Sequence, residues 1–258
     1  MARTKLNIKL LDMTPNAISI IYAACRQCYS AEFAGDLLKK EGDNLEKQAS
    51  LDRKDYLTGQ AEFVKRVVKS GHESPIEHVK FTFAVEGVSR VLTHQLVRHR
   101  LASYSQQSQR YVKKADFDYI LPPLIEAESE TKDEFIKIME DIQTSYKKIL
   151  NIFKDKGKEG EKVNQDARFI LPQAIETKIV ITMNCRELLH FFKQRCCARA
   201  QWEIRNLANK MLEICKQRLP AVFFKAGAKC ETLGYCPEGE KFTCGKYPLK
   251  RNVIKPRE

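Results

Sequence analysis

The spacing of apolar residues changes several times along this chain, and those changes limit the folds it can adopt. Residues 79–87, VKFTFAVEG, alternate apolar and polar side chains, and so do residues 175–183, IETKIVITM. Alternation indicates a strand with one buried face. Residues 128–156 and 186–216 instead carry apolar side chains every three or four positions, which indicates helices. We therefore expect an α+β fold: a single domain with a small, mainly antiparallel sheet packed with long helices.

Shorter periodic segments complete the predicted framework. Residues 6–12 have the pattern of a strand, and a helix should begin at Pro15, because proline suits the first helical turn. Helical spacing recurs over residues 52–70 and over residues 89–98. A polar stretch rich in Lys, Glu and Gly follows the helix expected from Pro15 and extends to residue 50.

Composition fits a folded protein that meets anionic partners. Hydrophobic residues make up 43% of the 258 and charged residues 30%, which is ordinary for a globular protein. The formal charge of +12 would attract nucleic acid, an anionic membrane or phosphorylated metabolites. No window approaches the roughly 18 apolar residues of a membrane span, and the N-terminus has no long apolar signal segment. We expect a cytoplasmic protein with no membrane partner.

The nine cysteines indicate reduced thiols, because the count is odd and no export signal accompanies it. Cys230, Cys236 and Cys244 lie near the C-terminus, with five and seven residues between them. These spacings differ from the short cysteine pairs of zinc ribbons, so we expect no metal, with a structural zinc site as the alternative. We divide the chain into a domain of residues 1–225 and a Cys- and Lys-rich tail of residues 226–258.

The segment RHRLASYSQQSQRY carries the densest chemistry of the chain. Arg98, His99, Arg100 and Arg110 are interleaved there with hydroxyls and amides. Such a mixture is poor core material, because buried charges need partners. Guanidinium groups grip phosphate bidentately, and hydroxyls and amides orient it. The segment therefore predicts a phosphorylated small molecule or a nucleic acid as the ligand.

A second motif, GHESPIEH at residues 71–78, has two compatible interpretations. Ser74 would be a helix N-cap, Pro75 the first helical residue and Glu77 the partner of Ser74 in a capping box. A helix start also exposes backbone N–H groups, which makes it a natural neighbour for an anionic cofactor.

These motifs together resemble the signatures of one family. Arg98-His99-Arg100, seven intervening residues and then Ser108 resembles the long signature of the flavin-dependent thymidylate synthases, and GHESPIEH resembles that family's other recurring motif. The segments DARFILP, MNCRELLHFF and RCCARAQWEI extend the resemblance over about residues 60–205. The chain departs from the family pattern where Ser105 replaces the usual Asn and Gln106 replaces a frequent Glu.

The resemblance implies a role for each matching residue. FAD would be bound by His72, Ser74, Glu77, Arg98, His99, Arg100, Gln106, Asn184, Arg186 and His190. Deoxyuridine monophosphate (dUMP) would be bound by Gln95, Arg98, Gln106, Gln107, Ser108, Gln109, Arg110, Arg168 and Arg195. Arg195 would be the catalytic residue, stabilising negative charge on the uracil. Ser108 would bind the nucleotide and not attack it, because a serine nucleophile needs an adjacent base.

The resemblance also implies the reaction and the assembly. dUMP would become thymidylate (dTMP), with methylenetetrahydrofolate as one-carbon donor and NADPH as reductant through FAD. The sites would be shared between the subunits of a homotetramer, with no nucleic-acid partner. A non-catalytic nucleic-acid-binding protein is the alternative, favoured by the charge of +12 and the basic C-terminus, and a zinc-binding interaction protein is a third hypothesis.

Overall fold

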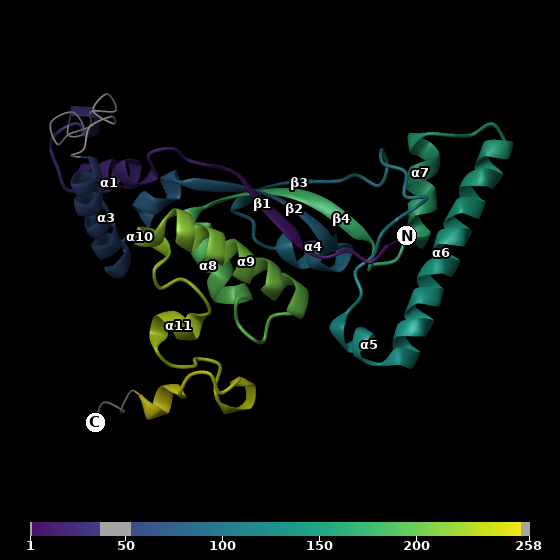
Figure 1. Cartoon of the computed structure of the whole chain (residues 1–258). Coiled ribbons are helices and arrows are strands. Elements are labelled where there is room, and N and C mark those ends of the chain that lie inside the picture. Colours follow the sequence, from purple (N-terminus) through teal and green to yellow (C-terminus); the bar gives the residue numbers. More distant parts are fainter. Residues whose placement is uncertain (1, 37–52, 254–258) are drawn as a thin grey trace. The chain divides into compact units, whose positions relative to one another are not determined.

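The computed structural model describes residues 2–36 and 53–253 (Figure 1), so most of the polar stretch predicted up to residue 50 lies outside the described residues. The predicted α+β class is confirmed. A four-stranded sheet has the order β1-β2-β4-β3, with β1 at Asn7–Met13, β2 at Lys80–Ser89, β3 at Ala102–Gln106 and β4 at Glu176–Asn184. The helices are α1 (Ala17–Gln27), α3 (Arg53–Lys69), α4 (Arg90–Leu96), α5 (Pro123–Ala127), α6 (Ser129–Asp155), α7 (Glu161–Ala167), α8 (Cys185–Arg195), α9 (Trp202–Arg218), α10 (Pro220–Phe223) and α11 (Lys229–Leu233). Short 3-10 helices are η2 (Ser74–His78), η3 (Arg168–Ile170), η4 (Glu240–Phe242) and η5 (Lys250–Asn252).

Strands β1, β2 and β4 lie where alternation predicts them, and β2 and β4 are antiparallel. The hydroxyls of Thr82 and Thr182 meet at 2.9 Å between these two strands, and the Cys185 N–H donates to the Val79 carbonyl at 2.8 Å. Residue numbers therefore fall along β4 as they rise along β2, which defines the antiparallel register.

Gly87 in β2 lets the N-terminal segment approach closely. Its φ is +68°, in the left-handed region that favours glycine. A Cβ at this position would lie 2.1 Å from the carbonyl oxygen of Lys5. Any side chain here would push the N-terminal segment away from β2.

The chain forms two compact units. Unit 1 comprises Met1–Lys9, Ala84–Arg98 and Ser103–Ile181, and unit 2 comprises Leu10–Phe83, His99–Ala102 and Thr182–Glu258. The predicted division into a domain of residues 1–225 and a tail of residues 226–258 stays a prediction.

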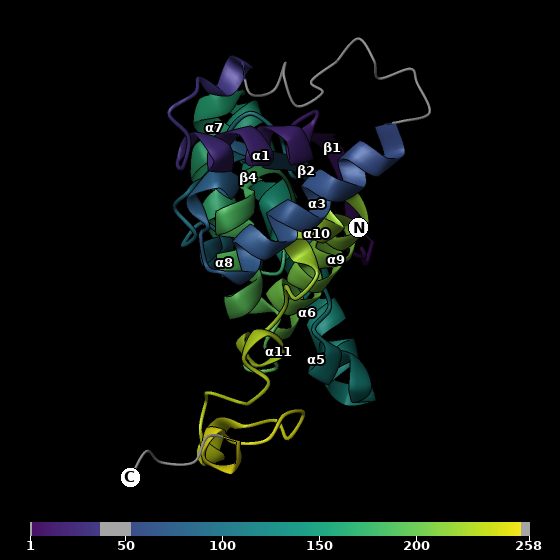
Figure 2. The same cartoon turned by 90° about the vertical axis from the view of Figure 1, so that its left-hand side faces the viewer.

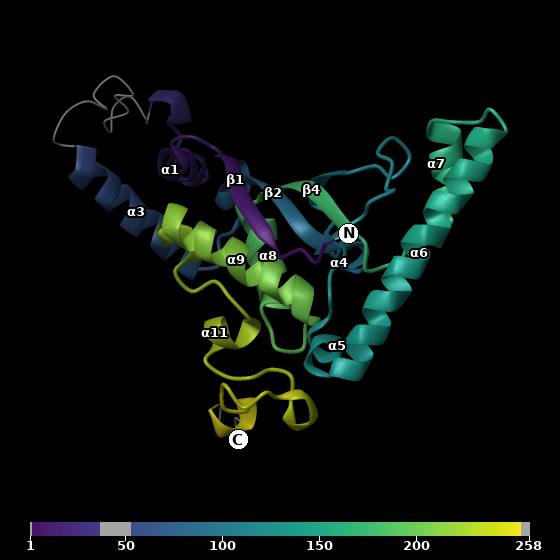
Figure 3. The same ribbon diagram turned by 45° about the vertical axis from the view of Figure 1, so that its right-hand side comes forward.

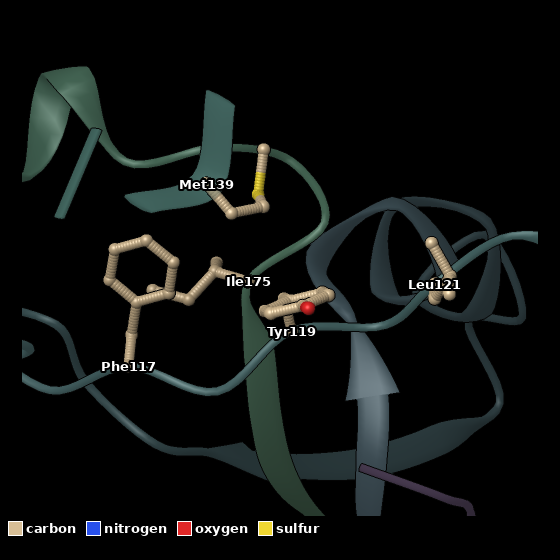
Figure 4. Close-up of a cluster of buried hydrophobic side chains, with 5 residues drawn as sticks. All are labelled: Phe117, Tyr119, Leu121, Met139 and Ile175. Carbon is tan, nitrogen blue, oxygen red and sulfur yellow. The ribbon is translucent and has the colours of Figure 1, made fainter. Parts of the chain in front are cut away.

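In unit 1, the long helix predicted over residues 128–156 is α6. It buries Met139, Tyr146 and Leu150 on one face, as its apolar stripe requires. Helix α5 lies at one end of α6 and α7 lies alongside the other end (Figure 3). Figure 4 shows the buried cluster that packs α6 against the approach to β4, formed by Phe117, Tyr119, Leu121, Met139 and Ile175.

In unit 2, aromatic side chains fix the helices that carry the candidate site. The rings of Phe81 in β2 and Phe223 in α10 have centroids 5.8 Å apart, and the ring of Phe192 in α8 lies 6.0 Å from that of Phe223. Edge-to-face aromatic pairs add about 0.5–1.5 kcal/mol beyond their buried area, so these contacts stabilise the packing of α8 against α10. Helix α8 also packs on α9, and α1 packs on α3 (Figure 2).

The predicted shorter helices are confirmed, with one change of starting residue. Helices α3 and α4 occupy residues 52–70 and 89–98 to within a few residues at each end. The helix expected from Pro15 begins instead at Ala17, because Asn16 takes the left-handed conformation, with φ at 53°.

The single helix predicted over residues 186–216 is wrong. Helix α8 ends at Arg195 and α9 begins at Trp202. The Gln201 side chain accepts hydrogen bonds from the first backbone N–H groups of α9, at 3.0 and 3.1 Å. This cap satisfies N–H groups that a continuous helix would bond internally, so the apolar spacing continues across a true helix end.

The capping box predicted at Ser74 is also wrong. The motif forms the 3-10 helix η2, whose N-cap is Glu73 and makes no side-chain cap bond, and Pro75 is its second residue. The Glu77 carboxylate pairs with Arg186 and not with a backbone N–H.

The C-terminal tail is folded back on itself through backbone bonds. The buried Cys236 donates its N–H to the Pro248 carbonyl at 2.7 Å. All nine cysteines are free thiols, as expected. Within residues 2–36 and 53–253, no group of three or more His, Cys, Asp or Glu is placed to hold a metal ion. No helix of that same part is long and apolar enough to cross a membrane.

Candidate active site

The predicted site residues fall into two sets according to the unit that holds them. Unit 2 holds most of the predicted FAD ligands together with the predicted catalytic arginine: His72, Ser74, Glu77, His99, Arg100, Asn184, Arg186, His190 and Arg195. Unit 1 holds most of the predicted dUMP ligands: Gln95, Arg98, Gln106, Gln107, Ser108, Gln109, Arg110 and Arg168.

Unit 2 contains a line of two hydrogen bonds, which we call the Glu187–His99–Arg195 line. The Nδ1 atom of His99 lies 3.1 Å from Oε1 of Glu187, and the Nε–H of Arg195 donates to Nε2 of His99 at 3.1 Å. The side chains of His99 and Glu187 are each only 6% exposed. The arrangement brings the predicted FAD ligand His99 into contact with the predicted catalytic Arg195.

The contact with Arg195 determines which ring nitrogen of His99 carries the proton. A guanidinium has no acceptor, so Nε2 of His99 carries a lone pair, and the proton on Nδ1 is donated to Glu187. Burial, together with the charges of Arg195 and His190, lowers the pKa of His99 to about 4. The imidazole is therefore neutral near pH 7. Burial raises the pKa of Glu187, and His190 opposes that rise.

The N-terminal cap of helix α8 fixes the position of Glu187. The side-chain oxygen of Asn184, the N-cap, accepts the N–H of Glu187 at 2.8 Å. Glu187 thus lies in the first turn, where an acidic side chain suits the helix dipole. Arg186 and His190 are four residues apart on the same helix, and both are exposed, as the predicted pair of ligands requires.

Arg186 is oriented by the acidic residues around η2. Its guanidinium pairs with Glu77, and its Nε lies 3.6 Å from Glu73. Lys193, two turns further along α8, lies 3.5 Å from Glu73. Exposed ion pairs contribute only about 0–1 kcal/mol each, so their main effect is on orientation. Ser74, in the same 3-10 helix, is exposed.

His72 is half-buried just before η2. Its Nδ1 lies 3.5 Å from the Tyr29 hydroxyl and 4.0 Å from Sγ of Cys25. The Tyr29 ring also meets the imidazole edge-on, with centroids 5.7 Å apart. Arg100 is exposed. His72, Arg100 and Arg186 together supply N–H donors that suit an anionic cofactor.

In unit 1, side-chain hydrogen bonds hold two glutamines of the arginine signature, Gln106 and Gln107. The Gln106 amide donates to the hydroxyls of Thr93 and Thr177, at 3.3 Å each. The Gln107 side-chain oxygen accepts from the ammonium group of the buried Lys114. Gln106 thus keeps hydrogen-bonding reach where the family often has Glu.

Ser108 and Arg110 form a turn. The Ser108 hydroxyl accepts the N–H of Arg110 at 3.2 Å, and the Arg110 guanidinium pairs with Glu161. The Asn164 amide donates to the Arg110 carbonyl at 3.0 Å. Gln109, between the two, is half-buried. The turn holds the Ser108 hydroxyl in place and leaves its O–H hydrogen to be donated.

Arg168 has a second guanidinium near it. Burial, and after it the charge of Arg168, lowers the pKa of Arg90, the first residue of α4. The Nε–H of Arg168 donates to the Gln165 carbonyl at 3.2 Å. Like charges on neighbouring groups repel each other, and guanidinium groups are also the side chains that bind phosphate bidentately. Gln95 on α4 is half-buried, and Arg98 after its end is exposed.

Sequence reasoning missed two of these residues, Glu187 and Arg90. Glu187 gave no signal, because an acidic residue in the first turn of a helix is ordinary. Arg90 did give one. A cation at the first position of a helix opposes the helix dipole, and such a placement needs a reason.

Comparison with known proteins places the chain in a family. Residues 9–221 match the family described as thymidylate synthase complementing protein. A flavin-dependent thymidylate synthase from Nitratidesulfovibrio vulgaris is 52% identical over 254 residues, covering 98% of this chain and all of the relative. Proteins of the same description from Clostridium tetani and Pyrococcus furiosus are each 48% identical, covering 93% and 67% of this chain and 93% and 71% of their own lengths. This chain belongs to the flavin-dependent thymidylate synthase family.

Membership in the flavin-dependent thymidylate synthase family makes the chain an enzyme and confirms the resemblance on which the site was predicted. The matched range contains every predicted site residue, and it also contains Arg90 and Glu187. The tail cysteines Cys230, Cys236 and Cys244 lie outside that range.

Proposed function

We propose that this protein converts dUMP to dTMP, taking the one-carbon unit from methylenetetrahydrofolate and the reducing hydride from NADPH through FAD. The observation that carries the proposal is the Glu187–His99–Arg195 line in a chain of this family. In this proposal, the line would supply the first requirement of the reaction, a fixed positive charge for the uracil. The substrates are cytoplasmic metabolites, so we propose a cytoplasmic enzyme with no nucleic-acid or membrane partner.

Arg195 would activate the uracil electrostatically. C5 of uracil becomes nucleophilic only if negative charge can build up on N3 and on the carbonyl oxygens. A guanidinium that is already in position stabilises this charge without reorganising, and one such donor is worth about 3 kcal/mol. Burial lowers the pKa of Arg195, but an arginine stays charged at neutral pH. The reaction then needs no protein nucleophile, and Ser108 is a binding residue.

FAD suits the donors that unit 2 exposes. Its diphosphate is anionic, and Arg100, Arg186 and His190 are exposed. We assign to FAD binding these three residues together with His72, Ser74, Glu77, Arg98, His99, Gln106 and Asn184. When bound, FAD supplies the redox chemistry, carrying a hydride from NADPH to the transferred carbon. Both ring nitrogens of His99 are engaged by Glu187 and Arg195, so His99 would contact the cofactor through its ring face or its backbone.

The nucleotide phosphate would be held by guanidinium groups. The charge of Arg168 contributes to the lowered pKa of Arg90, and each of these guanidinium groups could bind phosphate oxygens bidentately. The hydroxyl of Ser108, ordered by the N–H of Arg110, would donate to the same anion. We assign the remaining nucleotide contacts to Gln95, Arg98, Gln106, Gln107, Gln109, Arg110 and Arg195.

We further propose a homotetramer whose sites are shared between subunits. Phe169, next to Arg168, is 84% exposed, and Leu101, next to Arg100, is 71% exposed. Large apolar side chains exposed beside charged site residues favour cover by another subunit, and a symmetric assembly would provide it.

Colour and product identity test the proposal. The purified protein should show oxidised-flavin absorption or take up added FAD, and it should consume one NADPH for each dTMP while releasing tetrahydrofolate. Stoichiometric dihydrofolate without NADPH consumption would contradict the flavin route. A colourless protein that rejects FAD and binds polynucleotides with a steep salt dependence would favour the nucleic-acid-binding alternative.

A further inference from the structure

We propose that Glu187 is a positioning residue that sets the orientation of the Arg195 guanidinium through the ring of His99. The inference rests on the proposed function of Arg195. It adds a residue to which the resemblance gave no role.

The geometry couples the two ends of the line. An imidazole ring is rigid, so a hydrogen bond at Nδ1 also determines where the lone pair on Nε2 points. The Nε–H of Arg195 lies in the guanidinium plane and donates to that lone pair at 3.1 Å. The other four N–H groups are on the two terminal nitrogens of the same plane. Holding the ring with Glu187 therefore fixes the plane that would face the substrate.

The carboxylate also selects the tautomer on which the second bond depends. Glu187 accepts at Nδ1 and so keeps the proton there. With the proton on Nε2 instead, His99 would turn an N–H toward the N–H of Arg195, and two donors would face each other. A neutral amide in place of Glu187 can donate to Nδ1 and would permit that wrong tautomer.

The surroundings allow the ring little freedom. The Phe191 ring meets His99 edge-on with centroids 4.9 Å apart, and the His190 ring lies at 5.8 Å. The bond from Asn184 to the Glu187 N–H holds the first turn of α8. His99 and Glu187 are buried while Arg195 is half-buried, so the line runs from the core toward the surface. A purely structural hydrogen bond would need no extension toward the surface.

The test compares Glu187→Gln with a matched control, Glu176→Gln. Glu176 is also a buried carboxylate, which accepts the Gly87 N–H at 3.1 Å in unit 1. The holoenzyme of each variant is assayed for kcat and for the KM of dUMP. We expect Glu187→Gln to lower kcat by about 10–100-fold, the usual effect of removing an orienting partner, with KM and flavin absorbance nearly unchanged. Glu176→Gln should keep the wild-type kcat.

A second readout needs no turnover. With ¹⁵N-labelled histidine, His99 of the wild-type holoenzyme should show a protonated Nδ1 and an unprotonated Nε2, and Glu187→Gln should shift protonation toward Nε2. If that variant does not fold, Glu187→Asp takes its place, and it should keep the tautomer while losing part of kcat.

The outcomes separate this inference from the proposed function. If the wild type makes no dTMP, the proposed function is refuted. If the Glu187→Gln variant nevertheless shifts the His99 proton from Nδ1 to Nε2, the positioning role of Glu187 is left intact. An active wild type with an equally active, folded Glu187→Gln variant would overturn the positioning role. An equal loss of kcat in Glu176→Gln would overturn it too, because the effect would then be general to buried carboxylates.

Discussion

Replacing Arg195 with alanine should slow the chemistry far more than it weakens nucleotide binding. The variant loses one preorganised donor for the developing charge on uracil, worth about 3 kcal/mol, so kcat should fall by at least roughly a hundredfold. It also removes the donor to the buried Nε2 of His99, which should cost about 1–3 kcal/mol of folding stability. In a chain of this length that corresponds to a lower Tm by roughly 2–4 °C per kcal/mol.

The assay measures tetrahydrofolate and dTMP at saturating dUMP, with thermal unfolding in parallel, and the control is Ser108→Ala. Flavin absorbance should survive in both variants. Ser108→Ala removes one hydrogen bond to a charged group, so nucleotide binding should weaken by about 1.5–3 kcal/mol while turnover at saturation stays measurable. A nearly normal kcat for Arg195→Ala, beside a Ser108→Ala variant that binds dUMP but does not turn over, would refute the non-covalent mechanism.

Three further substitutions and one titration test other parts of the site. The pKa of His99 is lowered to about 4, so the unfolded chain binds this proton more readily. The free energy of unfolding should therefore fall as the pH drops from about 6.5 to 4, by up to about 1.4 kcal/mol per pH unit. The raised pKa of Glu187 contributes with the opposite sign. Denaturant titrations measure this dependence, and an equal slope of unfolding free energy against pH for the wild type and His99→Gln would contradict the assignment. Arg90→Ala and Arg168→Ala should each raise the KM for dUMP by about tenfold or more, as the loss of a charge-assisted phosphate bond requires, and steady-state kinetics with an unchanged KM would argue against the anion site. Arg186→Ala should weaken FAD binding in a fluorescence titration but change the unfolding free energy by less than about 1 kcal/mol, because its ion pairs are exposed.

The spacing of apolar residues predicted strands β2 and β4 and the long helix α6, because each of those elements buries one face. Strand β2 buries Phe81, Phe83 and Val85 on alternate positions, and α6 buries Met139, Tyr146 and Leu150 along one stripe. Strand β3 could not be predicted this way. Its sequence, ASYSQ, has no fully buried residue, and only its pairing with the distant β4 makes it a strand.

The motifs proposed site residues, and the structure adds contacts between them that the motifs could not predict. The arginine signature suggested His99 and the segment RCCARAQWEI suggested Arg195, but the bond between them joins positions 96 residues apart, and that from His99 to Glu187 joins positions 88 apart. Local spacing carries no information about such pairs. Motifs of this kind indicate candidate side chains, and the tertiary fold determines which partner each of them contacts.

The order of strands in the sheet has a consequence for the chain while it is being made. Strand β4 lies between β2 and β3, yet it is the last of the four to be synthesised. Translation at about 5–20 residues per second leaves the second edge of β2 unpaired for on the order of 5–20 s before β4 emerges. During that interval an apolar strand presents open N–H and C=O groups, the template on which chains associate wrongly. The nascent protein is therefore most vulnerable to aggregation, and most in need of a chaperone, between the synthesis of β2 and that of β4.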